Sequence, residues 1–309
     1  MRVVSLLASA TETVCALGAG EMLVGRSHEC DNPPWVKTLP ACSGPAFDIS
    51  LPSGEIDSEV RRRIHAGEPL YHIDMELIRS LHPDLVITQS HCEVCAVTPA
   101  DLERSDVCLI PAGQLSVSAS NLDEIYASIQ RIAERIGIKQ RGEAVVAAER
   151  RRLERIGDRT SRFRRPTVVV LEWTDPIFAI GNWGPELVEI ANGELLLGKT
   201  GQYSTAIPAE RLRDADPEFL IVAPCGFDLD RTLREQATLK NLEWWPELRA
   251  VREGKVVFAD GNLFFNRSGM TVSRTAEIVA QILHGISFVA PAGETYCGEY
   301  WRRLPIHAT

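Results

Sequence analysis

Two stretches of alternating strand and helix signals, separated by a helical stretch without strands, constrain the fold of this chain most. Apolar, β-branched runs bounded by turn residues predict buried strands, and the amphipathic segments between them predict helices. From residue 121 to 162 the apolar residues recur at helical spacing instead, at Ile125, Ile129 and Ile132 and on to Ile156. The pattern predicts one long helix, or two nearly collinear helices, between two α/β lobes.

The two lobes carry the same kind of pattern. Strands are predicted at residues 3–7, 23–26, 84–89 and 107–110 of the first lobe, and at 167–171, 219–223 and 255–259 of the second. Helices are predicted at residues 73–80, 98–104, 186–191, 208–215 and 272–283. Short-range alternation of this kind predicts an α/β fold with two Rossmann-like lobes, mostly parallel sheets and a ligand cleft between the lobes. The expected division is 1–118 for the first lobe, 119–165 for the connecting helix, 166–288 for the second lobe and 289–309 for a tail.

Composition excludes several classes of protein. Apolar residues make up 45% and charged residues 24% of the 309 residues, which is ordinary for a globular protein. The formal net charge of −9 argues against nucleic acid as a partner, because phosphate binding needs a basic face. No apolar stretch is long enough for a membrane segment. The apolar run at the N-terminus is too short for a signal peptide and leads at once to Thr11 and Glu12, so we expect a cytoplasmic location.

Cysteine is the most informative residue type, with eight in the chain. Cys92 and Cys95 form a Cys-x-x-Cys turn, which presents two sulfurs to one metal ion or forms a redox dithiol. Cys30 and Cys225 also follow predicted strands, and such loops gather at one edge of a parallel sheet. These four thiols predict a zinc site or an iron–sulfur cluster. The alternative is that they are packed structural thiols, as expected for free cysteines in cores.

Acidic and aromatic residues in the same predicted loops complete the candidate site. Three glutamates are candidates for carboxylate ligands or a catalytic acid/base: Glu29, Glu93 and Glu172. Rings in a cleft can stack on a planar ligand, and amide or imidazole groups can orient it. The candidate ligand-binding residues are His28, Glu172, Trp173, Trp183, Phe227, Asn262, Phe265 and Asn266. For each of them the alternative is an ordinary loop or packing role.

Several segments together resemble a known superfamily. They are residues 3–12, 17–25, 82–87, 215–221 and 251–256, which look like the opening strand and helix cap, the following turn, two "P-D-L-V"-type strands and a "V-x-x-G-R-V" turn. They resemble the class III, or helical-backbone, periplasmic-binding-protein superfamily over about residues 1–288. Residues 27–34, 92–97, 224–228 and 260–269 resemble its cytoplasmic cobalamin-binding-protein-like branch, with the Fe/B12 periplasmic-binding domain.

The resemblance implies a protein that binds a small molecule or metal complex, with cobalamin, another corrinoid or an iron complex as the candidate. Two departures from exported receptors, the missing signal peptide and the loops rich in Cys, His and Glu, count against a transporter partner. They leave two alternatives open. One is a cytoplasmic enzyme on the same scaffold with a cysteine-ligated metal or iron–sulfur centre, and the other is a metal store or sensor.

Overall fold

The computed structural model describes residues 1–90, 96–98, 101, 113–288 and 296–304. The chain divides into two compact units, Met1–Ala148 and Glu149–Thr309. The predicted strand 107–110 and most of the predicted helix 98–104 lie outside the described residues. The expected α/β class with mostly parallel sheets is confirmed in both units.

The first unit is built on a parallel sheet with strand order β2-β1-β5-β6. Its strands are β1 (Val3–Ser5), β2 (Leu23–Arg26), β5 (Leu85–Gln89) and β6 (Gly113–Val117), and β3 (Ser43–Pro45) pairs with β4 (Tyr71–Ile73) in a separate antiparallel ribbon. Its helices are α1 (Ala8–Ala16), α2 (Ser53–Ala66), α3 (Met75–Ser80), α5 (Leu122–Arg135) and the first part of α6 (Lys139–Thr160), with 3-10 turns η1 (Gly20–Met22) and η2 (Pro34–Thr38).

Helices cover both faces of this sheet. Successive residues of a strand point to opposite faces, so neighbouring residues of β1 pack against different helices. Val3 packs in a core with Val14 of α1 and Ile132 of α5. Val4, the next residue of β1, packs in a second core with Ile78 of α3. All these side chains are buried, so the first unit is a three-layer α/β structure.

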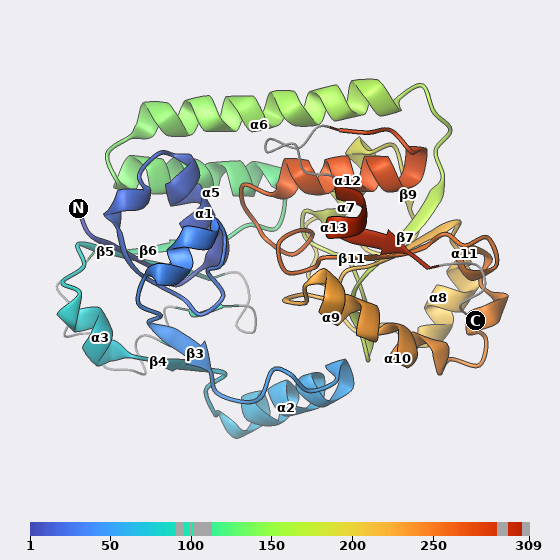
Figure 1. The fold of residues 1–309 in the computed structure, drawn as a ribbon, viewed down its shortest axis with the longest axis horizontal. Helices are drawn as coiled ribbons and strands as arrows, with labels where there is room; N and C mark the ends of the chain where they lie inside the picture. The colour runs from blue at the N-terminus through green and yellow to red at the C-terminus, as the bar shows by residue number, and fades with distance from the viewer. Residues whose placement is uncertain (91–95, 99–100, 102–112, 289–295, 305–309) are drawn as a thin grey trace. The chain divides into compact units, whose positions relative to one another are not determined.

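The stretch from residue 121 to 162 is not one helix, and its two helices are not collinear. The chain reverses at Gly137, which has a φ of +80° that favours glycine. Helix α6 then packs back on α5 at Gly142, where a Cβ atom would lie 2.5 Å from the Cβ of Ala133. Figure 1 shows the two helices side by side. Helix α6 is therefore the long helix that runs from the first unit into the second.

The second unit has a mixed sheet with strand order β12-β11-β10-β7-β8, and β9 also pairs with β7. Its strands are β7 (Thr167–Thr174), β8 (Ile177–Ala179), β9 (Glu194–Leu195), β10 (Phe219–Val222), β11 (Val256–Ala259) and β12 (Trp301–Arg303). Its helices are α7 (Gly184–Ile190), α8 (Ala209–Ala215), α9 (Leu229–Arg234), α10 (Gln236–Lys240), α11 (Arg249–Arg252), α12 (Val272–His284) and the kinked α13 (Tyr296–Glu299), with the 3-10 turn η4 (Trp245–Glu247).

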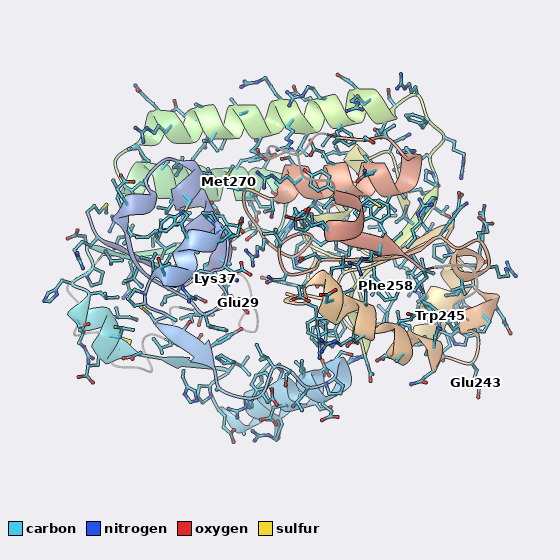
Figure 2. All side chains as sticks on the ribbon, viewed as in Figure 1. Glu29, Lys37, Glu243, Trp245, Phe258 and Met270 are labelled. Carbon is cyan, nitrogen blue, oxygen red and sulfur yellow. The ribbon has the colours of Figure 1, made fainter. Side chains whose placement is uncertain are left out.

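Continuous β-branched runs form the centre of this sheet, as expected for strands buried on both faces. Strands β7, β10 and β11 are parallel, and Phe258 of β11 is fully buried. Trp245 packs in the same core, whereas Glu243 is exposed on the outside of the unit (Figure 2). On the other face α12 lies beside α7 (Figure 1). The tail, which has no clear periodicity in the sequence, supplies β12, antiparallel to β11.

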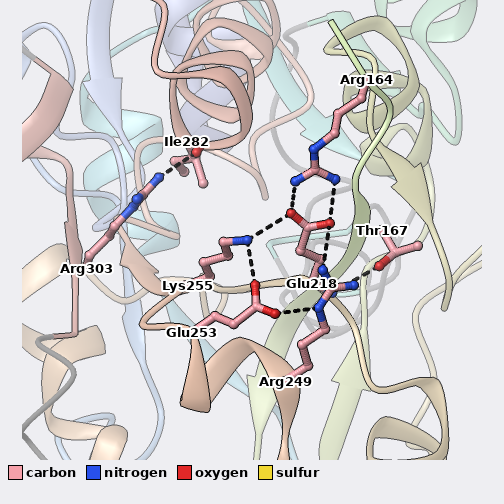
Figure 3. Close-up of polar contacts among 8 residues, drawn as sticks. All are labelled: Arg164, Thr167, Glu218, Arg249, Glu253, Lys255, Ile282 and Arg303. Atoms are coloured by element: carbon pink, nitrogen blue, oxygen red, sulfur yellow. Dashed lines mark hydrogen bonds and ion pairs between the residues drawn. The ribbon is translucent and has the colours of Figure 1, made fainter.

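An ion-pair network lies where the central strands of the second sheet begin, which we call its amino-end edge (Figure 3). The opposite edge, where these strands end, is the carboxyl-end edge. The carboxylate of Glu218, which is 2% exposed and directly precedes β10, accepts hydrogen bonds from both terminal nitrogens of Arg164. Lys255 Nζ lies 2.9 Å from the same carboxylate and Arg249 Nη2 lies 3.4 Å from it. The hydrogen bonds from Arg164 and then from Lys255 lower the pKa of Glu218 to about 2. The buried charge is therefore matched by cations from three different segments.

Candidate functional site

The carboxyl ends of β7, β10 and β11 lie side by side at the opposite edge of the same sheet. Val222, the last residue of β10, is level with Leu171 of β7 and with Phe258 of β11. Strand β7 continues beside β8 to Thr174, whereas residues 223–228 and 260–271 leave the sheet there, next to residues 172–176. Such an edge is where open α/β sheets take their ligands. Most of the residues predicted for a ligand lie in these segments.

Hydrogen bonds tie two of these segments into one body. The side-chain amide of Asn266 donates to the carbonyl oxygens of Ala223, at 3.0 Å, and Gly261, at 2.9 Å. The backbone N–H of Gly261 donates to the Phe227 carbonyl at 2.9 Å. A side chain at Gly261 would collide with the backbone, because its Cβ would lie 2.1 Å from the carbonyl oxygen of Pro224. The edge thus has a fixed shape, as a preformed binding site requires.

Two aromatic rings at this edge contact each other. The rings of Trp173 and Phe227 lie 5.1 Å apart at an angle of 51°. The Trp173 indole N–H donates to the carbonyl of Asp175 at 3.0 Å, and the Arg231 guanidinium carbon lies 4.5 Å from the Phe227 ring centre. Phe227 is buried, but Trp173 is only half-buried. Trp173 therefore offers apolar surface held in one orientation.

Other predicted ligand residues of the second unit take part in holding its shape. The side-chain oxygen of Asn262 accepts a hydrogen bond from Arg267 at 3.0 Å. Phe265 and Trp183 are 3% and 7% exposed, so both rings lie within the unit. Phe265 also has a φ of +60°, and its N–H donates to Thr275 Oγ1 at 3.2 Å. A ligand role for these residues stays a prediction.

Asp260 is a buried acid at this edge that the sequence patterns above do not predict as a site residue. It directly follows β11, and its carboxylate accepts the backbone N–H groups of Asn262, at 2.9 Å, and Leu263, at 2.7 Å. Burial raises the pKa of Asp260 to about 6 despite these donors and the nearby charge of Arg267. An Asp-Gly pair straight after a predicted strand was the sequence signal that could have identified it.

The corresponding edge of the first unit carries His28 and Glu29. The Arg26 guanidinium donates to the carbonyl oxygens of Ser27, at 2.9 Å, and Leu39, at 3.2 Å, and so fixes the loop after β2. His28 Nδ1 lies 3.1 Å from Ser43 Oγ, and Nε2 lies 3.9 Å from a carboxylate oxygen of Glu29.

Burial, together with the charge of Arg26, lowers the pKa of His28 to about 4. Its imidazole is therefore neutral at physiological pH, which is the form that binds metals. The Tyr71 ring centre lies 5.5 Å from that of His28. Among the predicted residues of the first unit, His28 is the one whose chemistry and partial exposure suit a metal-containing ligand.

The thiols predicted to bind a metal differ in burial and lie in different units. Cys30 is fully buried, and the Thr11 hydroxyl donates to its sulfur at 3.0 Å. The half-buried Cys225 lies at the second unit's edge, where its N–H donates to the Glu172 carbonyl at 3.0 Å. The remaining predicted residues of this group, Cys92, Cys95 and Glu93, lie outside the described residues. In the part of the chain that is described, no group of three His, Cys, Asp or Glu residues could hold a metal ion.

The burial of Cys30 therefore supports the packing alternative for that thiol. A cleft rich in cysteine finds no support in the described residues, and a site on all four thiols stays a prediction. Within the described ranges, every helix is also too short or too polar to span a bilayer.

Comparisons with known proteins agree with this architecture. A family described as periplasmic binding protein matches residues 3–263. A periplasmic heme-binding protein from Pseudomonas aeruginosa is 21% identical, with a TM-score of 0.70 over 93% of this chain and 94% of that chain. The heme-binding protein RhuT from Roseiflexus sp. RS-1 is 23% identical, with a TM-score of 0.67 over 92% and 98%.

The vitamin B12-binding protein BtuF of Vibrio cholerae is 19% identical, with a TM-score of 0.64 over 91% and 96% of the two chains. A search of curated proteins finds no match. The resemblance to the helical-backbone superfamily is confirmed by the family match and by these neighbours.

The expected cytoplasmic location is contradicted by these findings, since the family and these three neighbours are all described as periplasmic. That expectation rested on the apolar run at the start of the chain. Val3 and Val4 in this run are fully buried in β1. The run is explained by the core of the first unit and carries no information on location.

Proposed function

Because the chain belongs to the periplasmic binding protein family, we propose that it is the substrate-binding protein of an ABC importer and takes a metal-containing macrocycle. Heme and vitamin B12 (cobalamin), which two of the structural neighbours bind, represent this class. Its role is to bind the ligand and hand it to a transporter, without turnover. The carboxyl-end edge of the second sheet supplies the aromatic contacts.

The observation that carries the proposal is the fixed arrangement of Trp173 at the edge of the second sheet. Its ring contacts the ring of Phe227. The backbone carbonyl of Phe227 accepts a hydrogen bond from the N–H of Gly261, which holds the two loops together. A rigid, partly exposed indole suits the flat apolar face of a macrocycle and loses little entropy on binding.

The test is a titration of the purified protein with haemin, cyanocobalamin and aquocobalamin, followed by visible absorbance and tryptophan fluorescence. We expect saturable one-to-one binding of at least one of the three. Trp173→Ala should weaken that binding by about tenfold or more. The matched control is Trp35→Ala, which removes an indole that is 45% exposed, lies on η2 of the first unit and packs beside Gly20, before β2. Absence of binding of all three compounds would refute the proposal.

A metal centre held by Cys30, Cys92, Cys95 and Cys225 remains the alternative, with an enzymatic or metal-sensing role and Glu29, Glu93 or Glu172 as acid/base. Elemental analysis of anaerobically purified protein separates it from the first proposal. Zinc or iron bound stoichiometrically in the wild type and lost in Cys92→Ser would support the alternative. The burial of Cys30 behind Thr11 favours the first proposal.

A further inference from the structure

We infer that the outer side of α6 in the second unit, together with the turn that follows the helix, is a docking surface for a membrane of anionic phospholipids. The inference does not depend on the ligand site. It concerns residues 151–163 and the neighbouring residues 284–288, which all belong to the second unit. It follows from the charge on this surface and from the aromatic rings beside it.

This part of α6 has one buried side and one charged side. Leu153, Ile156 and Thr160 are at most 6% exposed, and their spacing places them on one side of the helix. The opposite side and the following turn carry exposed charged residues. We call four of them the arginine face: Arg151, Arg155, Arg159 and Arg162. Two exposed acids, Glu154 and Asp158, lie in the same stretch, so the surface has a surplus of two positive charges.

The other two arginines of residues 151–164 are not counted, because the fold uses them. Arg152 donates two hydrogen bonds of 2.7 Å to the carboxylate of Glu277 on α12. Arg164 is bound to the buried carboxylate of Glu218. Both guanidinium charges are therefore matched within the second unit.

The arginine face differs from the ordinary charged surface of a helix, where arginines pair with acids one turn away. On α2, exposed Arg61 forms an ion pair with Asp57, four residues earlier. Asp158 stands four residues before Arg162, at the same spacing. Among the described residues, however, the ion pairs of this stretch are those of Arg152 and Arg164, and no member of the arginine face forms one. Its charge is therefore available to a partner.

Two aromatic rings lie beside these arginines. The guanidinium carbon of Arg159 is 4.3 Å from the centre of the Phe288 ring, and that of Arg162 is 5.3 Å from the centre of the Phe163 ring. Both rings are half-buried. Arg159 also donates to the carbonyl oxygen of Ser287 at 3.0 Å, which holds this segment against the helix. Apolar ring surface is thus exposed next to the cations.

This combination suits the surface of an anionic bilayer. Arginine binds phosphate oxygens through its planar fork of N–H groups. Aromatic rings next to basic residues are typical of segments that lie at the boundary between headgroups and acyl chains. Arg151 and Arg159 are eight residues apart, or about 12 Å along a straight helix, so one flat surface can meet both.

The charge of the whole chain favours a membrane over a nucleic acid. The formal net charge is −9, so a polyanion that wraps around the molecule meets repulsion outside the arginine face. A bilayer contacts only the side that is turned toward it. Salt screens the more distant acids beyond about 8 Å. The local surplus of positive charge can therefore act on a membrane despite the acidic chain.

The test is flotation of the purified chain with two kinds of vesicle, one of phosphatidylcholine alone and one of phosphatidylcholine mixed equally with phosphatidylglycerol. A surplus of two charges should favour the anionic vesicles by about tenfold or more. The preference should shrink as salt is raised. The double variant Arg151→Gln with Arg155→Gln should lose most of it, whereas Arg151→Lys with Arg155→Lys, which keeps both charges, should retain it.

The matched control is the double variant Arg61→Gln with Arg62→Gln. It changes the net charge by the same amount, but at arginines of α2 that are paired with carboxylates, so the preference should stay as in the wild type. Equal binding to the two kinds of vesicle overturns the inference, and so does an equal loss in the α6 and α2 glutamine variants. Tighter binding to a DNA duplex than to anionic vesicles at the same phosphate concentration also overturns it. No macrocycle enters this experiment, so each result leaves the proposed function to its own test.

Discussion

In the second unit, the two ends of the central strands differ in the side chains that surround them. At the amino-end edge, Glu218 is buried and meets Arg164, Lys255 and Arg249 (Figure 3). At the carboxyl-end edge, the half-buried ring of Trp173 contacts the buried ring of Phe227. The comparison teaches that one edge buries a carboxylate among cations, whereas the other leaves an aromatic ring half-buried, where a ligand can reach it. The first edge should therefore determine stability and the second should determine binding.

Replacing Glu218 by Gln should have the largest effect on folding and none on binding. The change removes charge-assisted hydrogen bonds to a buried carboxylate, which costs up to about 3 kcal/mol of the free energy of unfolding; the cations themselves stay partly in water. The measurement is urea unfolding, where the midpoint should fall at unchanged slope. Glu253→Gln is the control, because that carboxylate is exposed and its ion pairs are screened by solvent, so the loss should be clearly smaller. Equal losses in the two variants would contradict the account of this edge.

Replacing Asn266 by Ala should affect both folding and binding. Two carbonyl oxygens, those of Ala223 and Gly261, lose their donor, which should lower the free energy of unfolding by about 2 kcal/mol. Because the tied loops shape the carboxyl-end edge, the affinity for the macrocycle should fall as well. Asn241→Ala, at an exposed position after α10, is the control. An Asn266→Ala protein with unchanged affinity would show that the loops do not shape the site.

Acid should lower the contribution of Glu218 to the free energy of unfolding over a defined pH range. The folded pKa of Glu218 is about 2, below the ordinary value of 4.5, so the ionised carboxylate is favoured in the folded state. Its contribution is present above about pH 4.5 and is lost as the pH falls toward 2. Unfolding free energies measured from pH 5 to pH 2.5 should decline less steeply in Glu218→Gln than in the wild type. Parallel curves would contradict the assignment.

His28 should produce a smaller effect in a higher pH window. Its folded pKa of about 4 lies below the ordinary 6.5, so the neutral ring is favoured in the folded state. The unfolded chain therefore binds the proton more readily, and stability falls as the pH drops from about 6.5 to 4. His28→Gln should flatten the curve in this window, as measured by thermal unfolding. His65→Gln, at an exposed site on α2, should leave the curve as it is in the wild type.

The central strands of the second unit can be predicted from the sequence because they are buried on both faces and are therefore apolar throughout. Residues 168–171 and 219–223 are uninterrupted apolar runs, and both form central strands. Strand β6 was not predicted, since Gly113, Gln114 and Ser116 interrupt it. Helix α2 was also not predicted, because its buried residues are only Ser53 and Ile56, so that it lacks an apolar stripe.

Only part of the candidate site could be predicted from the sequence. Trp173 and Phe227 were selected because they fall outside the periodic faces, and the structure brings them together. Cys30 was selected because it lies near His28, but its sulfur meets Thr11, a residue of α1 that no local pattern connects to it. Local spacing shows which residues leave a strand, but only tertiary packing decides which of them turn inward.

Hydrogen–deuterium exchange of the full chain, with and without the tightest-binding macrocycle, tests the difference between the two edges most directly. The account predicts slower exchange on binding in residues 172–174, 223–228 and 260–266, with no change in residues 216–218 and 253–256. Protection that includes the Glu218 edge, or that spares all three carboxyl-end segments, would contradict it.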